Sequence, residues 1–391
     1  MMAALDGMRI LDMTQYEAGT SCTQALAWMG ADVVKIEAPG RGDPGRGPNG
    51  NAEYFIVWNS NKRSIAINLK SEEGREILFD LLPKFDIFVE NYGPGVMEKL
   101  NLTYDIMRER NPDIIYARIK GFGVEGPWSD YKCYDMVAQA AAGAFSITGE
   151  ADGPPMRPGP TTGDAGTGVQ MALAISAAYI QKLRTGTGQY LELSMQEAMT
   201  YYLRTSTSGG RFGERPAGRS GNGGGAYSNL YPCLGDGPND YVFIMAVTAK
   251  MGEALVRVVG IAEEIGERNN HSAAETRALF MDKISEWTRK RTKYDAMREL
   301  AEAGIPASAV LTTQDLYTNR HLVERGFVRE VEHPVHGKIK LLGWPVRMSE
   351  SDVPVQPAPQ LGEHTAAVLT AELGLTKDEI ERLTQTGAIS A

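Results

Sequence analysis

Short apolar runs alternate with helical stretches over the first part of the chain. Five of these runs have the length and the Val, Ile and Leu content typical of buried strands, and they lie at 8–13, 31–37, 63–70, 86–92 and 113–123. Helices are predicted between them at 22–30 and 72–85. Strands that alternate with helices indicate an α/β fold with a mainly parallel sheet covered on both faces, whose ligands bind at the carboxyl ends of the strands.

The pattern continues with a helix at 135–146, an apolar helix directly after Asp164, a strand at 189–195 and a helix at 196–205. Composition then changes, because residues 206–228 are rich in Gly, Ser and Arg and read as a linker or a functional loop.

Beyond this segment the pattern predicts a smaller α+β domain. Residues 230–247 form a hairpin with Gly-Asp-Gly at its turn, helices follow from Lys250 to about Ala303, and a strand is expected at 307–312. The C-terminal part, from 326–343 to a helix within 362–373, is expected to return to the first domain.

Composition and charge exclude several classes of protein. The chain has 391 residues, 42% of them hydrophobic, and a net charge of −9 with scattered basic residues, which argues against nucleic-acid binding. Three cysteines without a CxxC pair suggest neither a zinc site nor disulfides. The N-terminus lacks the apolar core of a signal peptide and the apolar runs are too short for a membrane span, so we expect a cytoplasmic protein.

Common catalytic motifs are missing. The five histidines lie in the last third without HExxH spacing, so no metal site is predicted. The chain has no GxSxG elbow, no Walker A sequence and no GxGxxG in its first strand–helix turn, so hydrolase, P-loop and nicotinamide chemistry are all poorly supported.

Three segments remain as candidates for chemistry. Asp164 lies in GPTTGDAGTG just ahead of an apolar helix, where an aspartate most often caps the helix but can also act as a nucleophile. The glycines Gly223, Gly224 and Gly225 form either a flexible linker or a loop that presents N–H groups to an oxyanion. The stretch at 91–95, NYGPG, is either a simple turn or a phosphate-binding helix start.

Several motifs in the same order give the chain a resemblance to the class III CoA-transferases, over essentially its whole length. They are LDGMRILDMTQYEAG, GADVVKIE, NKRSIAINLK, VENYGPG, YDMVAQAAAG, GDAGTG, GTGQYLELSMQEA, GNGGG and PQLGEHT.

The resemblance implies a catalytic role for Asp164 as the nucleophile that attacks an acyl-CoA thioester. A mixed anhydride and then an aspartyl-CoA thioester would follow, and a free acid would collect the CoA. The resemblance also implies that Gly223–Gly225 close over the anhydride, and that Glu17 belongs to the catalytic site. No cofactor is expected, since coenzyme A and acyl-CoA are substrates.

The resemblance places CoA along the first domain and implies a set of binding residues. The matching positions are Ala18, Ile67, Asn68, Leu69, Lys70, Asn91, Tyr92, Gly93, Lys99, Lys132, Cys133, Tyr134, Asp135 and Met195.

It further implies an interlocked-ring homodimer and a domain layout. The large Rossmann-like CoA-binding domain would span 1–205 and be completed by 336–391, and the small α+β domain would span 229–312. The Gly-rich segment 206–228 would be the linker and active-site loop, and 313–335 the return linker.

Departures from formyl-CoA transferase affect the expected acid. Glu17 and Pro48 replace a glutamine and a gating tryptophan, and GGGAY replaces a longer glycine loop. We therefore expect a dicarboxylate or larger acid as one substrate. Glu17 either shares a proton with Asp164 or lies exposed at a helix start.

Two alternatives stay open. The first is an α-methylacyl-CoA racemase, although that branch uses a His–Asp pair where this chain has Cys133–Asp135. The second is a non-catalytic CoA-binding partner subunit, against which the intact Asp164 and glycine loop argue.

Overall fold

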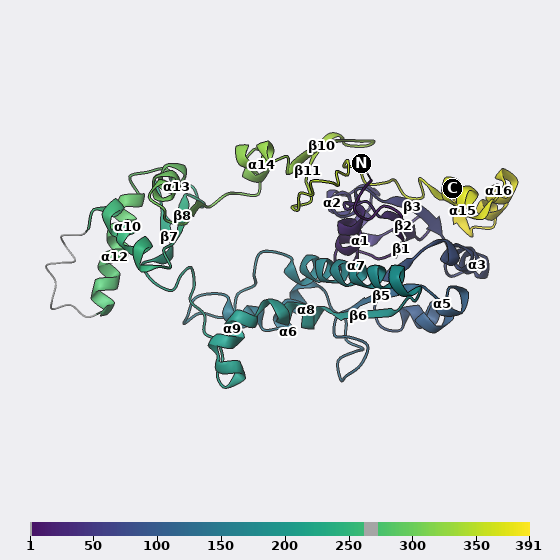
Figure 1. Ribbon diagram of the computed structural model, residues 1–391, viewed down its shortest axis with the longest axis horizontal. Coiled ribbons are helices and arrows are strands. Elements are labelled where there is room, and N and C mark those ends of the chain that lie inside the picture. Colours follow the sequence, from purple (N-terminus) through teal and green to yellow (C-terminus); the bar gives the residue numbers. More distant parts are fainter. Residues whose placement is uncertain (1, 262–272) are drawn as a thin grey trace. The chain divides into compact units, whose positions relative to one another are not determined.

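The computed structural model describes residues 2–261 and 273–391, and Figure 1 shows its elements. The described chain divides into two compact units. The first unit comprises Met1–Ala144, Arg157–Arg215 and Glu324–Ala391, and the second comprises Phe145–Met156 and Pro216–Val323.

A seven-stranded sheet forms the centre of the first unit, in the order β12-β3-β2-β1-β4-β5-β6. Its strands are β1 (Arg9–Met13), β2 (Asp32–Glu37), β3 (Arg63–Ile67), β4 (Ile87–Glu90), β5 (Ile115–Lys120), β6 (Tyr190–Ser194) and β12 (Ile389–Ser390). All neighbours pair in parallel except β12, which is antiparallel to β3. The fold is therefore mixed α/β with a largely parallel sheet, and the strand order from β3 to β6 is that of doubly wound α/β proteins.

Helices cover both faces of this sheet, as the strand–helix alternation predicts. One face packs against α1 (Ala18–Ala27), α6 (Asp135–Ala141), α7 (Thr167–Thr185) and α8 (Met195–Tyr202). The other packs against α3 (Glu72–Leu81), α5 (Tyr104–Arg110), α15 (Thr365–Leu373) and α16 (Lys377–Gln385). Buried Val, Ile and Leu side chains fill both layers, which explains why the central strands read as continuous apolar runs.

The helix predicted at 22–30 begins earlier, at Ala18. Its first turn, Ala-Gly-Thr-Ser, is completely buried and crosses α7 at close range. A Cβ on Gly168 would lie 2.0 Å from Ser21 Oγ and 2.6 Å from the Ala18 carbonyl, so α7 needs a glycine at this position. Small residues that look like a loop in the sequence thus serve close helix packing.

Other boundaries also differ from expectation. The helix predicted at 196–205 is interrupted at Leu203, after which α9 (Arg204–Gly209) extends into the segment taken for a linker. Two shorter helices, α2 (Glu53–Asn59) and α4 (Val96–Leu100), follow β2 and β4 along the chain.

The C-terminal residues complete the first unit in a way that the sequence analysis missed. Helix α16 starts with a capping box between Thr376 and Glu379, a signal visible in the letters TKDE. Strand β12 then adds an edge to the sheet beside β3, and Thr365 Oγ1 accepts a hydrogen bond from the Ala66 N–H at 3.0 Å. Residues Glu324–Ala391 belong to the first compact unit.

A hairpin of β10 (Val328–His333) and β11 (Gly337–Leu342) also belongs to the first unit. Val331 and Leu341 pack with Phe55 and Ile56 of α2 in a small apolar cluster.

In the second unit, strands β7 (Ser228–Pro232), β8 (Tyr241–Met245) and β9 (Ala307–Ala309) form an antiparallel sheet. Its core includes apolar residues of α10 (Ala249–Val259), α12 (Ala273–Thr288) and α13 (Lys293–Glu302). The predicted hairpin is confirmed, with Gly235-Asp236-Gly237 in its turn. Residues 262–272 of the predicted helical stretch lie outside the described residues.

The segment Phe145–Met156 joins the second unit, although the sequence places it within the large domain. The Arg219 guanidinium explains this, because it donates hydrogen bonds to the carbonyls of Ser146, Glu150 and Gly153 at 3.3, 3.1 and 2.6 Å. The sequence of residues 145–156 contains no local pattern that predicts a contact with Arg219, which lies 66 or more residues away in the chain.

Candidate active site

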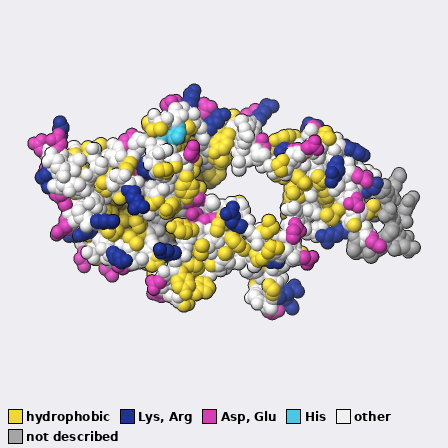
Figure 2. Space-filling view, turned by 180° about the vertical axis from the view of Figure 1, so that it is seen from behind, with side chains coloured by type: hydrophobic (Ala, Val, Ile, Leu, Met, Phe, Trp, Pro, Cys, Tyr) yellow, Lys and Arg dark blue, Asp and Glu magenta, His cyan; other side chains and the backbone are white. Residues whose placement is uncertain are grey.

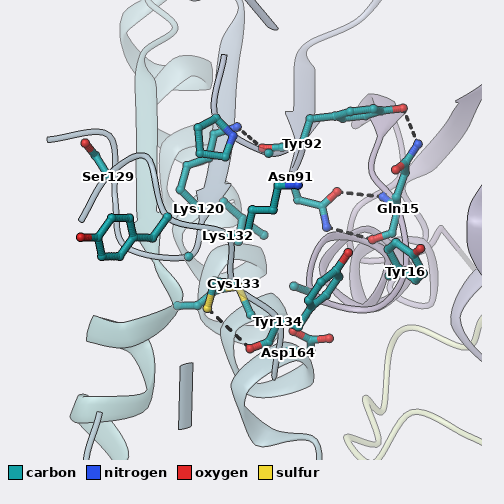
Figure 3. A pocket seen from close by; sticks show the side chains of 17 residues that line it. Gln15, Tyr16, Asn91, Tyr92, Lys120, Ser129, Lys132, Cys133, Tyr134 and Asp164 are labelled. Atoms are coloured by element: carbon teal, nitrogen blue, oxygen red, sulfur yellow. Dashed lines mark hydrogen bonds between the residues drawn. The ribbon is translucent and has the colours of Figure 1, made fainter. Parts of the chain in front are cut away.

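A cavity of about 230 Å³ opens at the carboxyl ends of β1, β4 and β5 in the first unit (Figure 3). Strands β1 and β4 are neighbours in the sheet, but β1 leads on to β2 on one side and β4 to β5 on the other. Such a point of reversal leaves a crevice between the two loops, where doubly wound sheets bind their ligands. The lining residues are Gln15, Tyr16, Ala18, Asn91, Tyr92, Gly93, Pro94, Ile119, Lys120, Gly121, Ser129, Tyr131, Lys132, Cys133, Tyr134, Asp164 and Met195.

Hydrogen bonds join the two loops into one wall of the cavity. The Gln15 N–H donates to Asn91 Oδ1 at 2.8 Å, and Asn91 Nδ2 donates to the Gln15 carbonyl at 2.9 Å. Gln15 Nε2 also donates to the Tyr92 hydroxyl at 2.7 Å. These hydrogen bonds tie the loop after β1 to the loop after β4.

Asp164 lies in a single π-helical turn, Thr162–Gly166, directly ahead of α7. The capping part of our prediction is wrong, because Gly166 is the N-cap of α7 and receives no side-chain cap. The wider turn places Asp164 two residues before the cap, and its carboxylate lies at the edge of the cavity beside Tyr134 (Figure 3). Its own N–H donates to Asp135 Oδ1 at 3.0 Å, and a Cβ on Gly163 would lie 2.5 Å from the Asp135 carbonyl.

Three buried acids gather here, Glu17, Asp135 and Asp164, with 4%, 7% and 8% of their surfaces exposed. Burial, followed by the charges of Glu17 and Asp135, raises the pKa of Asp164 to about 7. Among the described residues, no cation contributes to the shift of Asp164 or Glu17. An acid with this pKa is partly ionised at neutral pH, which is typical of catalytic groups.

Glu17 faces the cluster and is not exposed, so the alternative of a solvated glutamate at the helix start is wrong. Its carboxylate accepts hydrogen bonds from the Thr161 hydroxyl at 2.5 Å and the Tyr54 hydroxyl at 3.4 Å. Burial raises the pKa of Glu17, and the charge of Asp135 adds to this, while the two hydroxyl groups act in the opposite direction.

Tyr54 was not singled out from the sequence, although it touches Glu17 and burial raises its pKa above the ordinary value. Cys133 lies beside the same acids. Burial, with the charges of Asp164 and Asp135, raises the pKa of its thiol to about 11, so it is neutral at pH 7.

The structure brings together eight of the fourteen predicted CoA-binding residues on the cavity wall. These are Ala18, Asn91, Tyr92, Gly93, Lys132, Cys133, Tyr134 and Met195. Asp135 lies behind Asp164 instead, with Gln139 Nε2 donating to its carboxylate at 3.0 Å.

The remaining predicted residues lie outside the cavity lining. Ile67 and Leu69 are buried in the apolar core beside β3, while Asn68 and Lys70 lie in the turn after that strand. Lys99 lies in α4. Pro48 is exposed after a short 3₁₀ turn, and Gly223–Gly225 belong to the second unit.

Sequence reasoning singled out Pro94 only as part of the stretch 91–95, and it missed seven lining residues, Gln15, Tyr16, Ile119, Lys120, Gly121, Ser129 and Tyr131. Most of them flank the carboxyl ends of predicted strands, a position that could have marked them. Gly121 was a further signal, because a Cβ there would lie 2.1 Å from Cys133 Cβ, so the strand end and the Cys133 loop need a glycine at their contact.

Within residues 2–261 and 273–391, no group of three or more His, Cys, Asp or Glu side chains has an arrangement that could hold a metal ion. The helices of this part of the chain are also too short or too polar to cross a membrane. On the face shown in Figure 2, Lys and Arg side chains are interspersed with Asp and Glu.

Known proteins are similar to this chain in sequence and in fold. Residues 5–365 match the family described as CoA-transferase family III. The chain is 39% identical to a formyl-CoA:oxalate CoA-transferase of Streptomyces avermitilis, over 100% of both chains, and 40% identical to one of Streptomyces coelicolor, over 99% of both. A solved CAIB/BAIF family protein of Brucella suis has a TM-score of 0.84 and 29% identity, over 95% of this chain and 100% of its own.

The chain therefore belongs to CoA-transferase family III. It is an enzyme of the class III CoA-transferases.

Proposed function

We propose that this enzyme moves CoA from an acyl-CoA thioester to a free carboxylic acid with Asp164 as the nucleophile. The observation that carries the proposal is the buried Asp164 carboxylate at the edge of the cavity. The backbone N–H of the same residue donates a hydrogen bond to Asp135. A carboxylate needs no general base to become a nucleophile once it is ionised.

In the proposed reaction, an Asp164 oxygen bonds to the thioester carbonyl carbon and the C–S bond breaks, which releases the CoA thiolate and leaves a mixed anhydride. The thiolate attacks the Asp164 carbonyl, the donor acid departs, and an aspartyl-CoA thioester remains. The acceptor carboxylate displaces the thiolate from this thioester to form a second anhydride. The thiolate then attacks the acceptor acyl carbon, which releases the new acyl-CoA and restores the Asp164 carboxylate.

The cavity is suited to one part of the CoA thioester. Its volume of about 230 Å³ is smaller than the ~300–1,000 Å³ of typical ligand pockets. The rest of CoA would extend past the exposed Tyr131 and Lys132, where the lysine ammonium can meet a phosphate as a point charge.

For the acid, we propose a dicarboxylate or a larger acid. The relatives named above carry oxalate, a dicarboxylate, in their names. The loss of tryptophan at Pro48 supports a larger acid, although Pro48 does not line the described cavity.

Gly223–Gly225 are the proposed source of further N–H donors. Within the second unit they form a tight turn, because Gly225 bridges to Ser228 and a Cβ on Gly223 would lie 2.2 Å from the Ser228 carbonyl. A Cβ added to Gly224 would have no described atom of another part of the chain within 4 Å, so the backbone is open on that side.

CoA exchange followed by mass spectrometry tests the proposal. Wild type and Asp164→Asn would be incubated with formyl-, oxalyl-, acetyl- and succinyl-CoA against a panel of mono- and dicarboxylic acids. New acyl-CoA species with wild type alone support it, and the best pair identifies the acid. Deuterium uptake at the α-carbon of a branched acyl-CoA without exchange would instead indicate the racemase reaction, and bound acyl-CoA with neither signal would indicate a binding subunit.

A further inference from the structure

The turn between β1 and α1 holds a backbone conformation that its sequence does not favour. Tyr16 has φ = 57°, in the left-handed region, which costs about 1 kcal/mol or more for a bulky residue. The side chains of Tyr16 and Glu17, which are neighbours in the chain, lie in different surroundings. The Tyr16 ring lines the cavity and makes an edge contact with Tyr134 at 5.9 Å, while Glu17 enters the cluster of acids.

A buried ion pair forms hydrogen bonds with the backbone of this turn at two points. Lys35 of β2 and Asp43, the residue before a short 3₁₀ turn, are 0% and 3% exposed, and Lys35 Nζ lies 2.9 Å from Asp43 Oδ2. Lys35 Nζ donates to the Thr14 carbonyl at 2.7 Å. Asp43 Oδ1 accepts a hydrogen bond from the Tyr16 N–H at 3.1 Å.

Packing alone does not require this arrangement. Burying two charges is costly, and apolar residues of similar volume often replace a buried ion pair without loss of stability. Here each charge also bonds to the backbone of one turn, Lys35 at the Thr14 carbonyl and Asp43 at the N–H of the left-handed Tyr16. The pair thus holds a strained turn, and such strain is found where function needs a fixed geometry.

Other charged residues lie close to the Lys35–Asp43 pair. Asp43 donates its N–H to Glu37, whose carboxylate pairs with Arg46, and the Lys62–Asp12 pair lies nearby. Glu17 itself faces Asp164 and Asp135, with Tyr54 and Thr161 as hydrogen-bond donors. The Lys35–Asp43 pair is connected to Glu17 through the backbone of the turn, because it forms hydrogen bonds with Thr14 and Tyr16.

We propose that Lys35 and Asp43 are positioning residues that set Glu17 against Asp164 and Tyr16 against the cavity, and so control the ionisation of the nucleophile. The inference rests on the proposed function, since Asp164 is the group whose ionisation is controlled. Neither residue lines the described cavity. Each acts through the turn that it holds.

Asp43→Ala removes the acceptor for the Tyr16 N–H and the partner of Lys35. The turn should relax and Glu17 should leave the cluster, so the pKa of Asp164 should fall by about one unit. Glu17→Gln should produce a similar fall, and the double variant should produce no more than either change alone, because both act through one carboxylate. The measurement is the carboxyl ¹³C titration of Asp164 in labelled protein, together with the pH profile of kcat/KM.

An unchanged titration in Asp43→Ala, or the same shift in the presence and absence of Glu17, would overturn the proposal. Asp32→Ala is the control, because it breaks the Asp32–Arg63 pair at the other end of β2, and it should leave the titration in place. Asp43→Asn keeps an acceptor for the Tyr16 N–H and serves as the second variant if Asp43→Ala does not fold; it should show a smaller shift in the same direction, and no shift would count against the proposal. The titration needs no turnover, so a failure of CoA exchange in wild type would reject the proposed function without deciding this point.

Discussion

At the scale of single residues, the described charged groups that act on Asp164 are the two acids Glu17 and Asp135. Burial and the neighbouring Glu17 and Asp135 raise its pKa to about 7, and this has consequences for rate and for stability. Thr161 and Tyr54 donate hydrogen bonds to Glu17, which keeps a second acid in place close to Asp164.

The first prediction concerns Glu17→Gln. In the proposed reaction only the ionised Asp164 carboxylate attacks the thioester, so kcat/KM of wild type should rise with pH through about 7. Removing the Glu17 charge should lower this midpoint, because a like charge disfavours ionisation. Glu53→Gln, at an exposed position of α2, is the matched control and should leave the profile unchanged. Identical profiles for wild type and Glu17→Gln would remove the idea that the two acids share a proton.

The second prediction is that Asp164→Asn makes the protein more stable at high pH. Folding raises the pKa of Asp164 from 3.8 to about 7, so the unfolded state loses this proton first and stability falls as pH rises between these values. The amide avoids that loss, which amounts to up to about 4 kcal/mol at about 1.4 kcal/mol per pKa unit. Urea unfolding at pH 4, 6 and 8 measures it, and a gain that does not grow with pH would contradict the raised pKa.

The third prediction tests the acid. Pro48→Trp should restore a bulky side chain and lower turnover of large acids relative to small ones. Parallel rates for succinate-type and oxalate-type acceptors measure the ratio. If the ratio stays the same, Pro48 has no part in selecting the acid.

At the scale of elements, the active site depends on where α1 and α7 cross. The small residues of α1 let α7 approach so closely that Gly168 has no room for a side chain. This crossing places Glu17, at the start of α1, beside the π-helical turn that carries Asp164. The geometry of the acids is therefore a property of two helices and not of one motif.

The fourth prediction is that Gly168→Ala destabilises the protein by about 1 to 3 kcal/mol, because the added methyl group overpacks the contact with the α1 backbone. It should also lower kcat, since a shift of α1 moves Glu17. Gly209→Ala is the control, because this helical glycine has no described atom within 4 Å of the added Cβ, and the change should fall within about 1 kcal/mol of zero. Thermal unfolding and rate measurements on both variants decide, and equal effects would reject a tight crossing.

At the scale of the whole molecule, the family resemblance implies two chains linked as rings. The exposed face of α7 is consistent with a second copy, because Leu173 and Leu183 are 73% and 69% exposed. Linked rings cannot separate without unfolding, whereas ordinary dimers exchange subunits by dissociation.

The fifth prediction follows from this linkage. Purified tagged and untagged protein should form no mixed dimers on native mixing at any dilution, but should form them when the two are unfolded and refolded together. Native mass spectrometry measures the three species, with a mass of twice 42.6 kDa expected for the untagged dimer. Mixed dimers formed under native conditions would exclude interlocking.

The sequence by itself determined the parallel sheet, because strands buried on both faces must be apolar throughout and their periodicity is local. Through the motifs that carry the family resemblance it also singled out Asp164 as a candidate, together with Asn91, Tyr92 and Gly93 directly after β4. Three features were decided only by the tertiary structure. The π-helical turn, the approach of Glu17 to Asp164, and the hydrogen bonds of Lys35 to Thr14 and of Asp43 to Tyr16 all depend on contacts between residues distant in the chain. The effects of burial and charge depend on distances in space, and no local sequence pattern specifies which distant residues will lie next to one another.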